Sequence, residues 1–418
     1  MKKLWKRSIL LCVSVLFLAV FVVPKAHAVP AFGRTMGADC TACHATPTWQ
    51  LNQTGLDFLR NGHRTDHKAF KAEDIKWDNY LSLVWKFRAY NTDHPATNAG
   101  GKSQFEQHSF SIYTGGALSD RFSYFTEMYL SENSSNTASG SQSDSARKKL
   151  AEAFLQYNLP IGETNFVAFR AGEILPEIIH TFGVGARSIE DRAQIFNSTT
   201  NSANPYKPFF RSQGVDAKFN SEHVEATVGV VNGAATYTNH IDTNNHKDMY
   251  ASLQGNVDKN GSAIGLFQYQ GTHSTYATAD NSSTFLSFNN EFSKTLALAR
   301  YVHDKFRIVA AYMTGKEHQL VSSVDTETKN KGYFGLVDFN FTESLGAFAR
   351  YDMLDPLDTD AYSETKLITV GLNGMLYMSE KSGARWNLEL SDKKVSASSA
   401  TTAEVETKKI MAQLTWAL

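Results

Sequence analysis

The feature that most constrains this chain is the regular alternation of apolar and polar residues after Asn79. In residues 81–90, side chains such as Trp85 and Phe87 occupy one set of alternate positions, and Arg88 belongs to the other set. Successive side chains of a β-strand point to opposite faces, so this pattern predicts strands whose two faces meet different surroundings. The last residues, 410–418, show the same alternation.

The alternating segments number sixteen candidate strands, and the connections between them are of two kinds. Tight turns are expected at 118–121, 160–163, 220–222, 258–260, 303–304, 342–343 and 379–381, and longer polar stretches at 91–103, 132–148, 233–246, 271–283, 317–330, 355–364 and 392–405. Bacterial outer-membrane barrels combine an even strand number with short periplasmic turns and longer outer loops. We therefore predict an all-β transmembrane barrel of about 16 antiparallel strands over residues 79–418, with the N-terminal domain and the C-terminus on the periplasmic side.

A soluble β-sandwich or propeller is the alternative, because these folds also contain many short strands. Charged side chains argue against it, since they recur on the face opposite the apolar one: Lys86, Arg88, Glu127, Glu152, Arg170, Arg307, Arg350, Asp352, Arg385 and Glu389. A buried sheet face would not tolerate them. In a barrel the apolar face meets lipid and the charged face lines a water-filled lumen.

The N-terminus has the pattern of a secretory signal peptide. A basic stretch to Arg7 precedes an apolar run to Val23 and a small-residue site that ends at Ala28. Removal of residues 1–28 takes five basic residues away and leaves a net charge of 36 − 42 = −6. This charge excludes a nucleic-acid-binding protein, and no other apolar run is long enough for a membrane-spanning helix.

The mature chain retains two cysteines, in the motif Cys40-Thr41-Ala42-Cys43-His44. Two thiols at this spacing can form thioether bonds to one haem, with the adjoining histidine as an axial iron ligand. A structural zinc site needs four ligands, a redox-active Cys-x-x-Cys needs a thioredoxin-like context, and a plain disulfide does not need His44. We therefore predict one covalent haem c in a monohaem cytochrome domain over residues 29–78.

The second axial ligand of this haem is less well defined by the sequence. Met36, His63 and His67 lie in the same domain, and we take His63 as the first candidate distal ligand and Met36 as the alternative. The choice matters because the axial ligands tune the reduction potential. Histidines in the predicted loops, including His180, could be surface residues and nothing more.

One connection, residues 174–209, is much longer than the others. Loops beyond about 15 residues are usually functional or disordered. This segment contains several apolar residues, among them Ile178, Phe182 and Phe196, so we expect it to fold into the lumen and narrow it. A large external lobe is the alternative.

The N-terminal domain resembles the fused monohaem cytochrome–porins, outer-membrane proteins of iron-oxidising bacteria. The resemblance is carried by Val29-Pro30-Ala31-Phe32, Arg34, Gly37, the Cys40–His44 motif, Leu51-Asn52, Gly55, Phe58 and Asn61-Gly62. This chain departs from the family pattern at Gln53-Thr54-Gly55-Leu56, where members have a Pro-Phe-Gly-Arg-like segment, and at His63, where they have an aromatic residue. Beyond these residues, the chain shares with the family only the order of one haem motif before one barrel.

The resemblance implies an electron conduit that takes electrons from extracellular iron, by Fe(II) oxidation, and passes them to a periplasmic cytochrome. Because a bilayer's apolar band is about 25 Å tall, we expect residues 29–78 to close the periplasmic end of the barrel and hold the haem inside. Lys86, Arg88, Arg170, Arg307 and Arg350 would then neutralise the haem propionates or steer anions. The rival function is a solute- or anion-transporting porin with an accessory haem domain, and a third reading reverses the current toward an external acceptor.

Overall fold

The computed structural model describes residues 30–64, 80–93, 102–132, 150–200, 204–233, 245–278, 285–321, 324–357, 364–378, 382–396 and 404–418. The predicted signal peptide, residues 1–28, lies outside the described residues, as does His67. Among the described residues, no helix combines the length and apolarity needed to cross a membrane.

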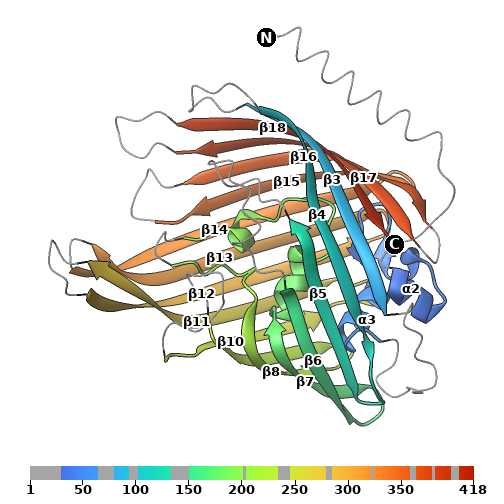
Figure 1. The fold of residues 1–418 in the computed structure, drawn as a ribbon, viewed down its shortest axis with the longest axis horizontal. Helices are drawn as coiled ribbons and strands as arrows, with labels where there is room; N and C mark the ends of the chain where they lie inside the picture. Colours follow the sequence, from blue (N-terminus) through green and yellow to red (C-terminus); the bar gives the residue numbers. More distant parts are fainter. Residues whose placement is uncertain are drawn as a thin grey trace, which may run out of the picture.

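The sixteen long strands form one closed antiparallel barrel, which confirms the predicted fold class. Each strand pairs with its neighbours in the chain, and β18 pairs with β3 to close the sheet (Figure 1). The strands are β3 (Leu81–Asp93), β4 (Lys102–Ala117), β5 (Phe122–Glu132), β6 (Leu150–Ile161), β7 (Asn165–Ile174), β8 (Ser212–Asn220), β9 (Val224–Val231), β10 (Asp248–Asn256), β11 (Ala263–Thr278), β12 (Phe285–His303), β13 (Phe306–Val321), β14 (Val324–Asn340), β15 (Leu345–Asp355), β16 (Thr365–Met378), β17 (Gly383–Val395) and β18 (Val405–Ala417). Closure leaves no unpaired sheet edge along the wall, which is the condition for a sheet to sit in lipid.

The barrel wall is inverted relative to a soluble protein, with apolar side chains outside and charged ones inside. Val228 is 62% exposed, whereas Arg88 is 2% exposed and Lys218 only 1%. The alternation predicted for residues 81–90 is present, since Leu81 is exposed and Ser82 is buried in β3. This arrangement suits an outer surface that meets lipid and an inner surface that is polar.

The short turns that the structure describes lie together at one end of the barrel. Two of the predicted long loops, 271–283 and 317–330, are mostly strand in the structure, because β11 pairs with β12 as far as Thr278 and β13 pairs with β14 as far as Val321. Polar side chains there belong to hairpins that continue beyond the rest of the wall (Figure 1). Polar composition alone could not separate such a hairpin from a loop, since cross-strand hydrogen bonds do not depend on apolar side chains.

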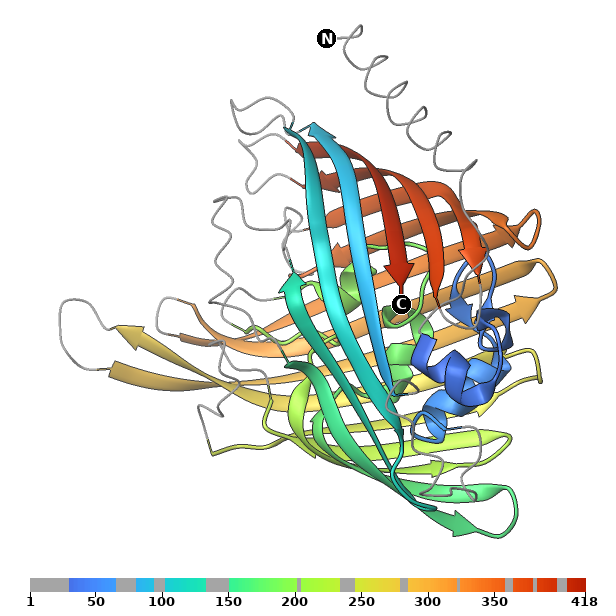
Figure 2. The same cartoon turned by 45° about the vertical axis from the view of Figure 1, so that its right-hand side comes forward.

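The N-terminal segment, residues 30–64, lies at the barrel end that carries the short turns (Figure 2). It comprises α2 (Pro30–Met36), the 3₁₀-turn η1 (Cys40–Ala42), the two-residue strands β1 (His44–Ala45) and β2 (Gln50–Leu51), and α3 (Gln53–Arg60).

Hydrogen bonds tie this segment to strands on opposite sides of the barrel. The Asn340 side chain of β14 donates to the Thr46 carbonyl at 3.0 Å, and Gln156 of β6 donates to the Arg60 carbonyl at 3.0 Å. Near β3, the Ala31 amide donates to Ser82 at 2.9 Å. The segment therefore spans the barrel opening and contacts the wall on several sides.

The connection between β7 and β8 runs through the barrel interior. It contains α4 (Glu177–Ile179), the π-helical turn η5 (His180–Val184) and α5 (Gln194–Asn197). Its apolar side chains, including Ile179, Phe182 and Phe196, are fully buried against inward-facing residues of β11–β14. An apolar patch on an otherwise polar inner wall thus gives this segment a surface on which to pack.

Candidate functional site

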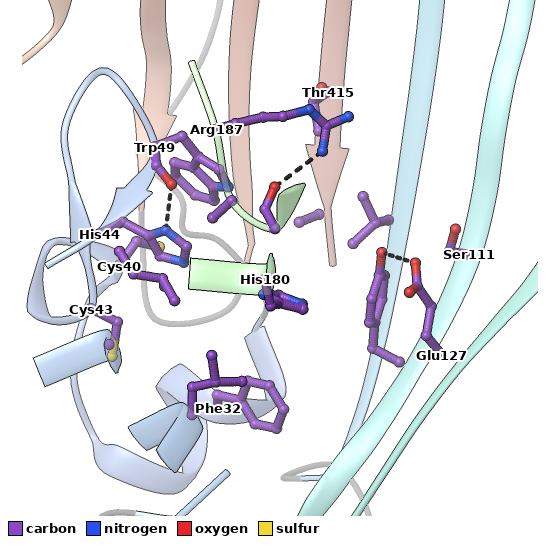
Figure 3. A pocket seen from close by; sticks show the side chains of 18 of the residues that line it. Phe32, Cys40, Cys43, His44, Trp49, Ser111, Glu127, His180, Arg187 and Thr415 are labelled. Atoms are coloured by element: carbon purple, nitrogen blue, oxygen red, sulfur yellow. Dashed lines mark hydrogen bonds between the residues drawn. The ribbon is translucent and has the colours of Figure 1, made fainter. Parts of the chain in front are cut away.

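A cavity of about 280 Å³ lies where the N-terminal segment, the barrel wall and the β7–β8 connection meet. The N-terminal segment contributes Cys40, Cys43 and His44, together with Met36 and His63. The connection contributes residues from His180 to Arg192, and β3–β5, β17 and β18 supply the wall (Figure 3). Every predicted haem-site residue that the structure describes therefore borders one space.

The two cysteines are held on the short turn η1 at the edge of this cavity. The Asp39 side chain accepts a hydrogen bond from the Thr41 amide at 2.9 Å and so begins the turn. Cys40 is buried and Cys43 is half-buried, and the two thiols are not joined in a disulfide. Burial raises the pKa of the Cys43 thiol to about 11, so Cys43 is a neutral thiol at physiological pH.

His44 is oriented by Trp49, which lies five residues later in the chain. Its Nδ1 lies 2.8 Å from the main-chain oxygen of Trp49, and the two rings stack with their centres 4.4 Å apart. A carbonyl oxygen can only accept, so Nδ1 carries the proton and Nε2 retains its lone pair. Burial lowers the pKa of His44 to about 4, which keeps the ring neutral. Metal-binding histidines commonly show this outer hydrogen bond.

Asn52 and Gly55 contact the Cys40–His44 motif and fix its position relative to α3. The Asn52 side chain caps α3 by accepting from the Gly55 amide at 3.0 Å, and it donates to the carbonyls of Thr41 and Ala42 at 2.9 and 3.0 Å. A Cβ on Gly55 would lie 2.2 Å from the Cys43 carbonyl oxygen, so only glycine allows α3 to approach the motif this closely. Both residues belong to the set that carried the family resemblance, and the structure gives them a positional role.

His63 lies deep in the site and is 7% exposed. Its ring stacks on Phe125 of the barrel wall at 4.2 Å and on Phe32 at 5.3 Å, and the rings of Phe58 and Phe154 lie near it. Its Nδ1 is buried and has no hydrogen-bond partner among the described residues. Burial lowers the pKa of His63 to about 3, and nearby His180 adds to this effect. The residue is therefore a neutral, packed histidine beside the cavity.

His180, which the sequence placed in a loop with no assigned role, also borders the cavity. It comes from η5 of the barrel's inner connection, and Figure 3 shows it with His44 among the residues that line the cavity. Its Nδ1 is buried with no hydrogen-bond partner in the described part of the chain. Burial lowers the pKa of His180 to about 4, and Arg211 acts in the same direction. The length and apolar content of 174–209 were the only sequence signals that this segment turns inward.

Basic side chains also lie on the rim of the cavity: Lys86, Arg187, Arg192, Arg211 and Arg385. Glu127 binds Arg211 at 2.7 Å, and Glu190 binds Lys86 at 2.9 Å. Arg192 lies over the Phe209 ring at 3.6 Å, and its Nε has no hydrogen-bond partner among the described residues. Burial, together with Arg187, lowers the pKa of Arg192 to about 9. This rim can accept negative charge.

Of the five basic residues that the sequence proposed for this role, Lys86 alone lines the cavity. Arg170 pairs with Asp216 at 2.5 Å and Arg350 with Asp352 at 2.6 Å, so their charges are compensated within the wall. Arg88 and Arg307 also lie elsewhere on the inner wall. Alternation shows which side chains face the lumen, but it does not show how far along the barrel each one lies.

The residues present fit a covalently attached haem. Two thiols that are not in a disulfide, a histidine whose Nε2 retains its lone pair, apolar walls and a basic rim surround one cavity. These are the groups that thioether attachment, axial ligation and two propionates require. Within the described residues, no cluster of three or more His, Cys, Asp or Glu side chains has the arrangement of a metal-ion site.

Comparison with solved structures identifies the barrel type. An anion-selective porin from Comamonas acidovorans matches with a TM-score of 0.56 at 10% identity, covering 81% of this chain and 98% of that chain. The outer membrane channel DcaP of Acinetobacter baumannii matches with a TM-score of 0.55 at 8% identity, covering 80% and 96%. OmpT, an outer membrane protein of Vibrio cholerae, matches with a TM-score of 0.52 at 12% identity, covering 81% and 97%.

The chain thus has the fold of bacterial outer-membrane porins. No protein-family model matches the sequence, and no curated protein matches it. The porin half of the family resemblance agrees with these comparisons, and the cytochrome half stays a prediction from Cys40–His44.

Proposed function

We propose that this protein is an outer-membrane electron conduit. One haem c would be bound covalently by the N-terminal segment inside a porin-type barrel. The observation that carries the proposal is the placement of Cys40, Cys43 and His44 on one cavity, with Nδ1 of His44 bound to the Trp49 carbonyl and Nε2 left free. An ordinary solute channel has no use for this combination.

A haem in this cavity would supply one-electron redox chemistry. Cys40 and Cys43 would attach it through thioether bonds, and Nε2 of His44 would bind its iron. The Trp49 carbonyl fixes the imidazole's orientation and raises its basicity as a ligand. Arg192 and its basic neighbours offer counter-charges for the propionates.

The proposed partners follow from the geometry of a barrel in lipid. The exposed apolar outer face suits outer-membrane lipid. With the short turns on the periplasmic side, residues 30–64 face a soluble periplasmic electron-carrier cytochrome, and the opposite opening faces extracellular iron or mineral. Fe(II) oxidation is the activity that the family resemblance favours, by analogy.

The test is electron transfer across a sealed membrane. Purified protein is placed in lipid vesicles that contain oxidised cytochrome c, and Fe(II) is added outside. We expect reduction of the enclosed cytochrome c with this protein, and none with Cys40→Ser/Cys43→Ser vesicles. Equal rates for both proteins would refute the proposal. A midpoint potential well below that of the iron couple would instead favour outward electron delivery.

The second candidate function is a porin for small anions or other solutes, with an accessory haem domain. The comparisons support this candidate more directly, because two of the matched proteins are an anion-selective porin and an outer membrane channel. The basic rim of the cavity also suits anions.

Liposome swelling separates the two functions. Fast swelling in small sugars or anions would favour a porin. Slow swelling, in a protein that still reduces enclosed cytochrome c, would favour the conduit. The hydrogen bonds that hold residues 30–64 across the barrel opening lead us to expect slow swelling.

A further inference from the structure

We infer that His180, on the inner connection of the barrel, is the second axial ligand of the haem. This inference rests on the proposed haem at Cys40 and Cys43. It assigns the iron one ligand from the N-terminal segment and one from the barrel, so that the cofactor joins the two parts of the protein.

The placement of His180 is the first reason. It lines the same cavity as His44 but comes from a different element, and Figure 3 shows both side chains among the residues around that cavity. Axial ligands approach iron from opposite faces of the porphyrin. A donor on the barrel side is therefore suitably located for a haem that is attached on the N-terminal side.

The lack of any competing partner is the second reason. His180 has a buried Nδ1 without a hydrogen-bond partner in the described residues. The backbone of Gly185 presses against its ring, since a Cβ on that glycine would lie 2.2 Å from Nδ1. Its pocket thus holds the imidazole in place without using its hydrogen-bonding capacity.

The connection that carries His180 is firmly attached. Glu177 binds the Lys218 ammonium at 2.5 Å, and the Thr181 carbonyl accepts from Arg300 at 2.9 Å. Phe182, two residues after His180, is fully buried. Because the chain is fixed on both sides of His180, little conformational entropy would be lost when this side chain binds iron.

The other candidates are engaged elsewhere. His63 also has a buried Nδ1 without a described partner, but its ring is stacked on Phe125 at 4.2 Å and on Phe32 at 5.3 Å. His108 of β4 has a carboxylate partner, Glu106, at 3.3 Å. The Met36 sulfur lies 3.9 Å from the Cys43 sulfur, beside the attachment point. His180 is the lining histidine outside the N-terminal segment whose ring has no described polar partner.

The experiment uses the full-length holoprotein purified in detergent, with the variants His180→Ala, His180→Met and His63→Ala. Haem staining after denaturing electrophoresis reports covalent attachment, and the shift in mobility on heating reports a folded barrel. Optical and electron paramagnetic resonance spectra report the ligands. We expect every variant to stain and to fold.

We expect the wild type and His63→Ala to be low-spin with two nitrogen ligands, and His180→Ala to become high-spin and to recover a low-spin spectrum with added imidazole. His180→Met should raise the midpoint potential, because thioether ligation does so. A low-spin, unchanged spectrum in His180→Ala would overturn the assignment while leaving the haem proposal intact. An unstained wild-type protein would overturn both.

Discussion

The guanidinium of Arg60 lies 2.5 Å from the carboxylate of Glu225, and this ion pair joins the end of α3 to strand β9 of the barrel. Both side chains are less than a tenth exposed. Arg60 and Glu225 lie far apart in the sequence. Their ion pair therefore forms only when the N-terminal segment is in place at the opening of the closed barrel. It therefore offers a way to loosen the segment without touching the cysteine motif.

We predict that Arg60→Met loosens residues 30–64 while the barrel stays folded. Removal of one partner from a buried ion pair leaves an uncompensated charge and costs about 3–5 kcal/mol. Limited proteolysis should cut the N-terminal segment faster in the variant. Arg60→Met/Glu225→Gln, which removes both charges, should regain part of the protection, and equal cleavage in all three proteins would show that the pair does not hold the segment.

We predict that Cys40→Ser/Cys43→Ser abolishes haem staining after denaturing electrophoresis. Serine keeps the size of the side chain but cannot form the thioether bond. The variant barrel should still shift in mobility on heating, because neither residue belongs to the wall. Stain that survived the double substitution would show that these thiols do not attach the haem.

We predict that His44→Ala abolishes the normal low-spin haem absorbance while the barrel still inserts into membranes. The matched control is Trp49→Phe, because His44 bonds to the main-chain oxygen of Trp49 and phenylalanine keeps an aromatic ring for stacking. That control should retain the wild-type spectrum. An unchanged spectrum in His44→Ala would mean that the proximal ligand is a different residue.

We predict that Glu190→Gln loosens the inner connection and increases ionic conductance. Glu190 is fully buried and binds Lys86 at 2.9 Å and also Arg385, so it fastens the connection to β3 and β17. Its neutralisation exposes these cations to the lumen and should shift selectivity toward anions in planar bilayers. Glu222→Gln, at an exposed turn where the partner Lys259 is 3.7 Å away, is the control and should change neither quantity.

The lowered pKa of Glu190 predicts how the conductance depends on pH. Burial alone would raise the pKa of Glu190, but Lys86 and Arg385 outweigh it and hold the pKa well below the ordinary 4.5. A carboxylate whose pKa is lowered by folding stabilises the folded protein in full at any pH above its ordinary pKa. This stabilisation is lost as the pH falls from the ordinary pKa toward the lowered one. Conductance should therefore be constant from neutral pH to about 4.5 and rise only below it. A rise between pH 7 and 5 would point to another group.

The barrel could be predicted from the sequence because its cause is local. Lipid outside and water inside impose a period of two on every strand, and residues such as Leu81 and Ser82 record it directly. The extent of each strand was less predictable. Residues 271–278 are mostly polar, yet they form part of strand β11. They do so because backbone hydrogen bonds between β11 and β12 continue beyond the part of the wall that contacts lipid.

The candidate site was predictable only where its residues are adjacent in the chain. Cys40, Cys43 and His44 form one motif, and their spacing carries the expectation of haem. Arg192 and His180 have no such signature, because they reach the cavity through the path of the β7–β8 connection. That path depends on an apolar patch that β11–β14 create together on the inner wall.

By itself, the sequence determined the alternating strands, the thiol–histidine motif and the excess of apolar residues in 174–209, because each is a property of neighbouring residues. Only the tertiary structure decided that His180 faces the space beside His44 and that Arg60 meets Glu225. The physical reason is closure. The register of sixteen strands fixes which inward side chains share a level of the barrel, and no segment of the chain contains that information alone.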